Sequence, residues 1–204
     1  MTRLQLVVEC HGEESASQLL VRRVLHERLG QFGVDLLRPQ RRRSVPGLLA
    51  RGAEALLRYQ RVAEANSDRV LWLLDHDDGC ALESVRDSYA ALATEGVRKA
   101  TAFAFICREY ESLFLEEPSC CASYYGMPAE PFYAGRSSRD AKGHISRTLP
   151  RGQIYKPTVD QAPLTARLQL DVLADSSESY GHLERAVSWL CDGSVVGLYP
   201  TRGL

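Results

Sequence analysis

The amino-acid sequence predicts an α/β fold with a mostly parallel sheet flanked by helices, followed by a helical extension. Residues 69–75 form a nearly continuous apolar run that ends in a carboxylate, a pattern typical of a parallel strand covered on both faces. Residues 3–9 alternate, become fully apolar and also end in a carboxylate. Segments with apolar residues at helical spacing separate such runs, so strands and helices are expected to alternate.

In the first half of the chain, four strands are predicted to alternate with three helices. The strands are expected at 3–9, 33–37, 69–75 and 99–107. The helices, predicted from helical spacing or from Ala, Leu and Glu content, are expected at 13–29, 52–65 and 83–94. This order favours right-handed crossovers between parallel strands and places the core within residues 1–107.

The second half, residues 108–204, is expected to form a helical and irregular extension packed on the core as part of one compact domain. Helices are predicted at 110–117, 161–174 and 180–191. Between the first two, residues 117–139 mix Pro, Gly, Ser, Cys and Tyr without periodicity and predict an irregular connection. The tail from residue 192 onward is expected to be frayed or held by a partner.

Composition narrows the class of protein. The chain has 204 residues, 45% of them hydrophobic and 25% charged, with a formal net charge of −1, which excludes a disordered or collagen-like chain. No apolar run approaches the roughly 20 residues of a membrane helix, and the first residues lack a signal-peptide core. We therefore expect a cytoplasmic protein without a membrane partner, whose six cysteines are reduced thiols.

Carboxylates follow two of the predicted strands. Glu9 ends the first and Asp75 ends the third, so both are expected at the carboxyl edge of the sheet, where ligands of open parallel sheets collect. Asp77 lies two residues beyond Asp75. Three carboxylates at one edge repel one another unless a cation offsets their charge, and oxygen-only ligation suits Mg²⁺ or Mn²⁺.

Further acids are candidates for the same site. Glu13 and Glu14 follow Glu9 by one short turn, although acids in the first turn of a helix also complement its dipole. Glu109 or Glu111, after the fourth predicted strand, is a candidate ligand of a second metal position, with helix-surface charge as the alternative. The sequence leaves open which of these acids joins the site.

Basic residues offer two candidate contacts for an anionic substrate. Lysine is scarce, and Lys142 stands out as a loop cation able to stabilise developing negative charge. Four arginines within six residues form a basic loop that predicts contacts with nucleic-acid phosphates, with a solvated surface segment as the alternative. These arginines are Arg38, Arg41, Arg42 and Arg43.

The spacing of the acids resembles that of the Toprim domain, which occurs in topoisomerases, bacterial primases and nucleases. The resemblance rests on Glu9 with Glu13 after one strand and on Asp75-x-Asp77 after another. Four further segments extend it over nearly the whole chain and look like a small bacterial Toprim-like family. These segments are Arg-Glu-Tyr-Glu at 108–111, Asp-Ala-Lys-Gly at 140–143, Tyr-Lys-Pro-Thr-Val-Asp-Gln at 155–161 and Ser-Tyr-Gly-His-Leu at 179–183.

This resemblance implies an Mg²⁺-dependent nuclease related to the overcoming-lysogenization-defect nucleases, which often pair with a separate ABC-type or AAA-type ATPase in antiphage defence. By position, Glu9 corresponds to the first Toprim acid, Asp75 and Asp77 to the paired aspartates, and Lys142 to a downstream lysine. Cys10 stands where the Toprim glycine usually follows the first acid. The expected activity is phosphodiester hydrolysis, with DNA or RNA as substrate and the oligomeric state left open.

Two other functions remain as alternatives. The first is a catalytically weak, Toprim-like regulatory subunit that docks on an ATPase through the large apolar side chains of residues 119–136. These are Tyr124, Tyr125, Met127, Phe132 and Tyr133. The second is a small-molecule phosphatase. The sequence holds neither G-x-x-x-x-G-K-[ST] nor G-x-G-x-x-G, so ATP hydrolysis is expected from a partner.

Overall fold

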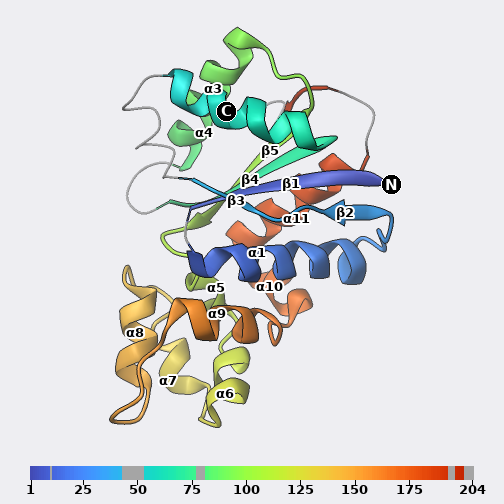
Figure 1. Ribbon diagram of the computed structural model, residues 1–204. Helices are drawn as coiled ribbons and strands as arrows, with labels where there is room; N and C mark the ends of the chain where they lie inside the picture. The colour runs from blue at the N-terminus through green and yellow to red at the C-terminus, as the bar shows by residue number, and fades with distance from the viewer. Residues whose placement is uncertain (10, 43–52, 77–80, 193–195, 200–204) are drawn as a thin grey trace.

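The computed structural model describes residues 1–9, 11–42, 53–76, 81–192 and 196–199. It confirms the predicted fold class, because a parallel sheet flanked by helices forms the centre of the molecule (Figure 1). Among the described residues the sheet has six strands in the order β2-β1-β4-β5-β6, with β3 also paired to β1. Each described pairing is parallel.

The strands are short at the rims of the sheet and long at its centre. They are β1 (Thr2–Val8), β2 (Val34–Leu36), β3 (Gln40–Arg41), β4 (Arg69–His76), β5 (Ala100–Cys107) and β6 (Leu198–Tyr199). The helices around the sheet are α1 (His11–Arg23) with its π-helical continuation η1 (Val24–Arg28), α3 (Ala53–Asn66), α4 (Ala81–Glu95) and α11 (Glu178–Cys191). The extension contains α5 (Ser112–Glu116), α6 (Ser119–Tyr125), α7 (Glu130–Tyr133), α8 (Ala141–Thr148), α9 (Pro157–Thr165) and α10 (Leu170–Ser176).

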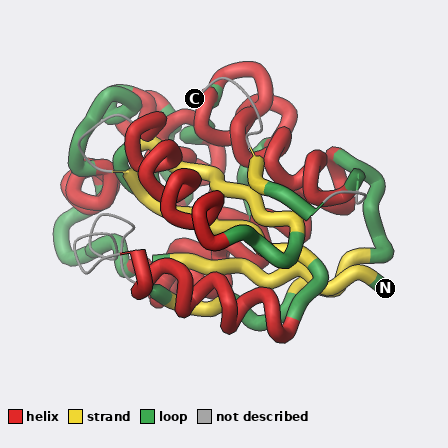
Figure 2. Tube along the Cα trace, turned by 90° about the horizontal axis from the view of Figure 1, so that it is seen from above, coloured by secondary structure: helices red, strands yellow, loops and turns green. Residues whose placement is uncertain are grey.

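The elements lie in layers. Helices α3 and α4 cover one face of the sheet, α1 and α11 cover the other, and the extension lies beyond α1 (Figure 1). Seen from above, the strands run side by side with helices on both sides of them (Figure 2). None of the helices in the described part of the chain is long and apolar enough to span a membrane.

The apolar run of β4 has the expected cause. Val70, Trp72 and Leu74 pack with the α3 and α4 layer, whereas Leu71 and Leu73 pack with the α1 and α11 layer. Because the side chains of a strand alternate between its faces, a strand buried on both sides must be apolar at successive positions. This requirement explains why the sequence shows a continuous run there.

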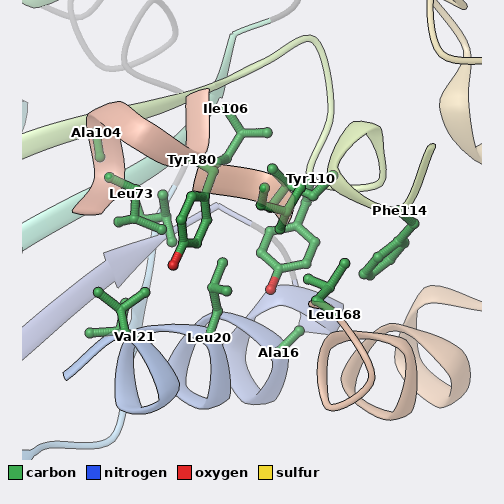
Figure 3. Close-up of a cluster of buried hydrophobic side chains, with 14 of the residues drawn as sticks. Ala16, Leu20, Val21, Leu73, Ala104, Ile106, Tyr110, Phe114, Leu168 and Tyr180 are labelled. Carbon is green, nitrogen blue, oxygen red and sulfur yellow. The ribbon is translucent and has the colours of Figure 1, made fainter. Parts of the chain in front are cut away.

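Helix α1 is buried on two sides. Ala16, Leu20 and Val21 of this helix lie among side chains of β4, β5, α11 and the extension, including Tyr110 and Leu168 (Figure 3). The same apolar cluster contains residues of β1 and residues of α5, α8 and α9. The segments 1–107 and 108–204 therefore share one apolar cluster through α1.

A hydrogen-bonded polar network lies within the other apolar layer. The indole N–H of Trp72 donates to Gln60 Oε1 at 2.8 Å, and Gln60 Nε2 donates to Thr101 Oγ1 at 2.7 Å and to Glu64 Oε1 at 3.1 Å. All four side chains are buried. Buried polar groups that find partners in this way tie α3 to β4 and β5, because their hydrogen bonds offset the cost of removing them from water.

The second half differs from the sequence-based expectation in two segments predicted to lack regular structure. Residues 117–139 contain the short helices α6 and α7, and α6 ends at Gly126, whose φ of 67° suits a left-handed cap. The tail was expected to be frayed or held by a partner. In its described part it forms β6, which the sheet itself holds through pairing with β5. The helices and the strand in these two segments are too short to show a helical or strand periodicity in the sequence.

The helix predicted at 161–174 is divided. Helix α9 begins four residues earlier, with Pro157 at its first position, where the missing N–H of proline costs nothing. It ends at Thr165, and α10 begins at Leu170. Helix α8, which the sequence did not predict, begins at the N-cap Asp140, whose carboxylate accepts from the Gly143 N–H at 2.8 Å.

The position of Leu20 generates a stability prediction. This side chain is fully buried between the sheet and the extension, so Leu20→Ala should lower the free energy of unfolding by about 2–5 kcal/mol. Urea unfolding followed by tryptophan fluorescence and by far-ultraviolet circular dichroism should shift together. Val172→Ala, at an exposed position of α10, is the control and should change the stability by less than about 0.5 kcal/mol. Separate transitions for the two probes would contradict a shared core.

Candidate functional site

The carboxyl ends of β1, β4 and β5 meet at one edge of the sheet. Parallel register pairs Val7 with Trp72, and Asp75 with Ile106. The chain bends at Glu9, directly after β1, while Asp75 is the penultimate residue of β4 and is partly buried. Neighbouring strands lie about 4.8 Å apart, so the backbones that carry Glu9 and Asp75 are adjacent at this edge.

The basic loop reaches the same edge, because β3 continues alongside β1. Val8 pairs with Arg41, and the Arg42 N–H donates to the Val8 carbonyl at 2.6 Å. Arg42 therefore comes level with Glu9, one position beyond the last paired residues. The side chains of Arg38 and Arg41 are exposed. Arg43 lies outside the described residues.

Lys142 lies between two carboxylates that follow β5. Its Nζ is 3.6 Å from Glu109 Oε1 and 3.5 Å from Glu111 Oε2. Its backbone N–H, in the first turn of α8, also donates to Glu109 Oε2 at 3.0 Å. The structure thus brings the predicted cation together with both predicted acids that follow β5, and these two carboxylates compensate the single charge of Lys142.

Glu111 is the buried centre of this group. The residue is 0% exposed, and its Oε1 accepts from the Tyr155 hydroxyl at 2.7 Å and from Gln161 Nε2 at 3.2 Å. Lys142, at the outer side, keeps 34% of its side chain exposed. We call Glu109, Glu111, Lys142, Tyr155 and Gln161 the Glu111 cluster.

Burial dominates the electrostatics of the Glu111 cluster. Loss of hydration raises the pKa of Glu111, against the opposing effects of the Lys142 charge and of the Tyr155 hydrogen bond. The pKa of Tyr155 is also raised, first by its burial and then by the adjacent Glu111 charge. Glu109 adds to the upward shift of Glu111 because it carries a like charge.

The turn after β5 is fixed by the segments that suggested the Toprim-like family. Arg108 adopts a positive φ of 71°, and its guanidinium donates to the carbonyls of Ser137 and Ser138. The Cys107 N–H donates to Ser179 Oγ at 2.9 Å. Together with the Glu111 cluster, these bonds bring segments 108–111, 140–143, 155–161 and 179–183 to the end of one strand.

Several predicted site residues fall outside what the structure describes. Asp77, Cys10 and Arg43 are not among the described residues, and Glu13 lies in the first turn of α1 with its side chain outside the description. Glu14, in the same turn, is partly buried. Assignment of Glu13 and Asp77 to a metal therefore stays a prediction.

The aromatic residues considered as an interface mostly cover the core. Phe132 is fully buried, and Tyr124, Tyr125 and Met127 pack partly buried against the main apolar cluster. Tyr133 differs, since it is 54% exposed. Sequence reasoning also gave no role to Tyr155, Gln161 or Tyr59. Tyr155 and Gln161 belong to the segment 155–161 of the Toprim-like resemblance, but nothing in that segment indicates which carboxylate they contact.

Comparisons with known proteins found no match: no family model, no curated protein and no solved structure matches this chain. Among the described residues, no group of three or more His, Cys, Asp and Glu side chains is arranged to hold a metal ion.

Glu111 generates a pH prediction. A carboxyl group whose pKa is raised by folding binds more protons in the folded chain than in the unfolded chain, so its contribution to stability is present below its ordinary pKa and is lost as pH rises through the raised one. Glu111→Gln removes this loss. Urea unfolding should show the variant gaining stability relative to the wild-type protein as pH rises from about 4 to about 7.

The control is Glu130→Gln, at an exposed carboxylate of α7. Its stability relative to the wild-type protein should not change with pH over the same range. A Glu111→Gln variant that instead loses relative stability with rising pH would show that Lys142 and Tyr155 outweigh the desolvation of the carboxylate.

Proposed function

We propose that this protein is a metal-dependent nuclease of Toprim type that hydrolyses phosphodiester bonds in nucleic acid at the carboxyl edge of the sheet. The observation that carries the proposal is the adjacency of β1 and β4, which brings Glu9 and Asp75 to one edge. Arg42 beside Glu9 adds a cation for the anionic substrate. The Toprim resemblance of the sequence supports the same assignment.

The residue types at this edge support Mg²⁺ or Mn²⁺ as the proposed ion, because these ions prefer carboxylate oxygens as ligands. Magnesium is commonly held by only one or two protein carboxylates, with water and substrate phosphate filling its other positions. Glu9 and Asp75 supply two such carboxylates on neighbouring strands, and the sequence adds Asp77 and Glu13 as further candidates. When bound, the ion supplies Lewis-acid polarisation of a phosphate oxygen and lowers the pKa of a water molecule.

The remaining residues have separate roles in this proposal. Glu9 and Asp75 would hold the ion, and the pairing of β1 with β4 places their backbones on neighbouring strands. The backbone N–H and the ammonium group of Lys142 fix the carboxylate of Glu109 after the end of β5, where Glu109 is the candidate for a second metal position. Lys142 is a positioning residue here, because two carboxylates balance its charge.

The proposal includes an ATPase partner, which is implied by the Toprim-like resemblance of the sequence. The chain carries neither of the two glycine-rich phosphate-binding patterns, so it would not hydrolyse ATP itself. The proposed arrangement is an effector nuclease that works with a separate ABC-type or AAA-type ATPase in antiphage defence. A missing partner would silence cleavage, so metal affinity is the first quantity to measure.

The test is calorimetric titration of Mg²⁺ and Mn²⁺, followed by cleavage assays on DNA and RNA with the divalent ion. Asp75→Asn should abolish metal binding and reduce cleavage by at least about 100-fold, because it removes one of few charged ligands. Asp175→Asn, at an exposed aspartate of α10, is the matched control and should retain both. Equal metal affinity in the wild-type protein and in Asp75→Asn would reject the site and favour a docking module.

A further inference from the structure

Arg42 is stacked on an aromatic ring beside the end of β1. Its guanidinium carbon lies 4.2 Å from the centre of the Tyr59 ring on α3. One terminal nitrogen donates to the Arg41 carbonyl at 2.7 Å, and the other donates to Gln40 Oε1 at 3.1 Å. A guanidinium held by a ring face and by two hydrogen bonds keeps a fixed plane and direction.

The charge of Arg42 is not balanced within the described chain. No described carboxylate forms an ion pair with it, and its covered Nε–H finds no acceptor there. Each terminal nitrogen keeps a second hydrogen beyond the one already donated, in the fork that matches a phosphate group. Lys142, at the other end of the carboxyl edge, has its charge offset by Glu109 and Glu111.

Within the described residues, the loop around Arg42 carries two further arginines. Arg38 and Arg41 are the exposed arginines of the described loop, so about three phosphates could be neutralised there. A protein that binds a duplex through about 6–10 phosphate contacts needs more cations than the described residues of this loop supply. A single strand can gain affinity in a second way, because its unstacked bases can lie on aromatic rings or on guanidinium planes.

We infer that the Arg42–Tyr59 stack is a strand-anchoring subsite whose ligand is a single-stranded nucleic acid, with a phosphate held by the terminal nitrogens of Arg42. This inference deepens the proposed nuclease function, on which it rests for the position of the reacting phosphate beside Glu9. It names the substrate class as single-stranded.

The experiment measures binding without metal, so that cleavage does not enter. Fluorescence anisotropy in EDTA follows a labelled oligothymidylate of about 12 nucleotides and a duplex of the same length, over a series of salt concentrations. The wild-type protein should bind the single strand more tightly than the duplex. Arg42→Gln should weaken single-strand binding about 5- to 20-fold and reduce the slope of log K against log salt by about 0.7.

Three further variants separate charge, stacking and folding. Arg42→Lys should keep the salt slope but bind more weakly, because lysine lacks the planar fork. Tyr59→Leu should weaken binding, whereas Tyr59→Phe should preserve it because the ring remains. Arg58→Gln, at an exposed arginine of the same helix, is the matched control and should change affinity by less than about twofold. Circular dichroism of each variant confirms that it is folded.

Three results would overturn the inference: no single-strand binding by the wild-type protein, duplex binding at least as tight as single-strand binding, or unchanged affinity in folded Arg42→Gln. The nuclease proposal fails separately. If Asp75→Asn and the wild-type protein bind the strand equally, in an Arg42-dependent manner, but neither binds metal, the subsite stands and the catalytic proposal falls.

Discussion

Parallel pairing of β1, β4 and β5 is the constraint on which the candidate site depends. It sends three strand ends to one edge, so residues far apart in the chain come to adjacent strand ends there. Glu9, Asp75 and Glu109 each come at or just beyond the end of one of these strands. Their proximity as backbone positions requires no further contact, because strand spacing alone provides it.

Helix α1 connects this edge to the extension. It packs against the sheet with one side and against α9 and its neighbours with another, so the extension completes a core that the sheet alone would leave open. The extension in turn carries Lys142, Tyr155 and Gln161 to the end of β5. The packing of the extension against α1 and the sheet therefore contributes to stability and also positions these three side chains at the strand end.

Lys142 and Arg42 are both cations at this edge, but their surroundings give them different roles. Lys142 lies against one half-buried and one fully buried carboxylate, and its ammonium group satisfies charges within the protein. Arg42 contacts an aromatic ring and neutral acceptors, which fix its direction but leave its charge uncompensated within the described residues. A buried charge needs a partner, and an anchored charge beside open solvent can take one from a ligand.

The fold class, the long strands and the carboxylates that follow them could be predicted from the sequence, because burial on both faces requires a continuous apolar run and parallel order brings the strand ends to one edge. The sequence did not determine the pairing of Lys142 with Glu111, the contacts of Tyr155 and Gln161, or the stacking of Arg42 on Tyr59. These contacts join segments far apart in the chain and leave no local period or spacing. Only the tertiary packing of β3, α3, α8 and α9 against the strand ends decided them.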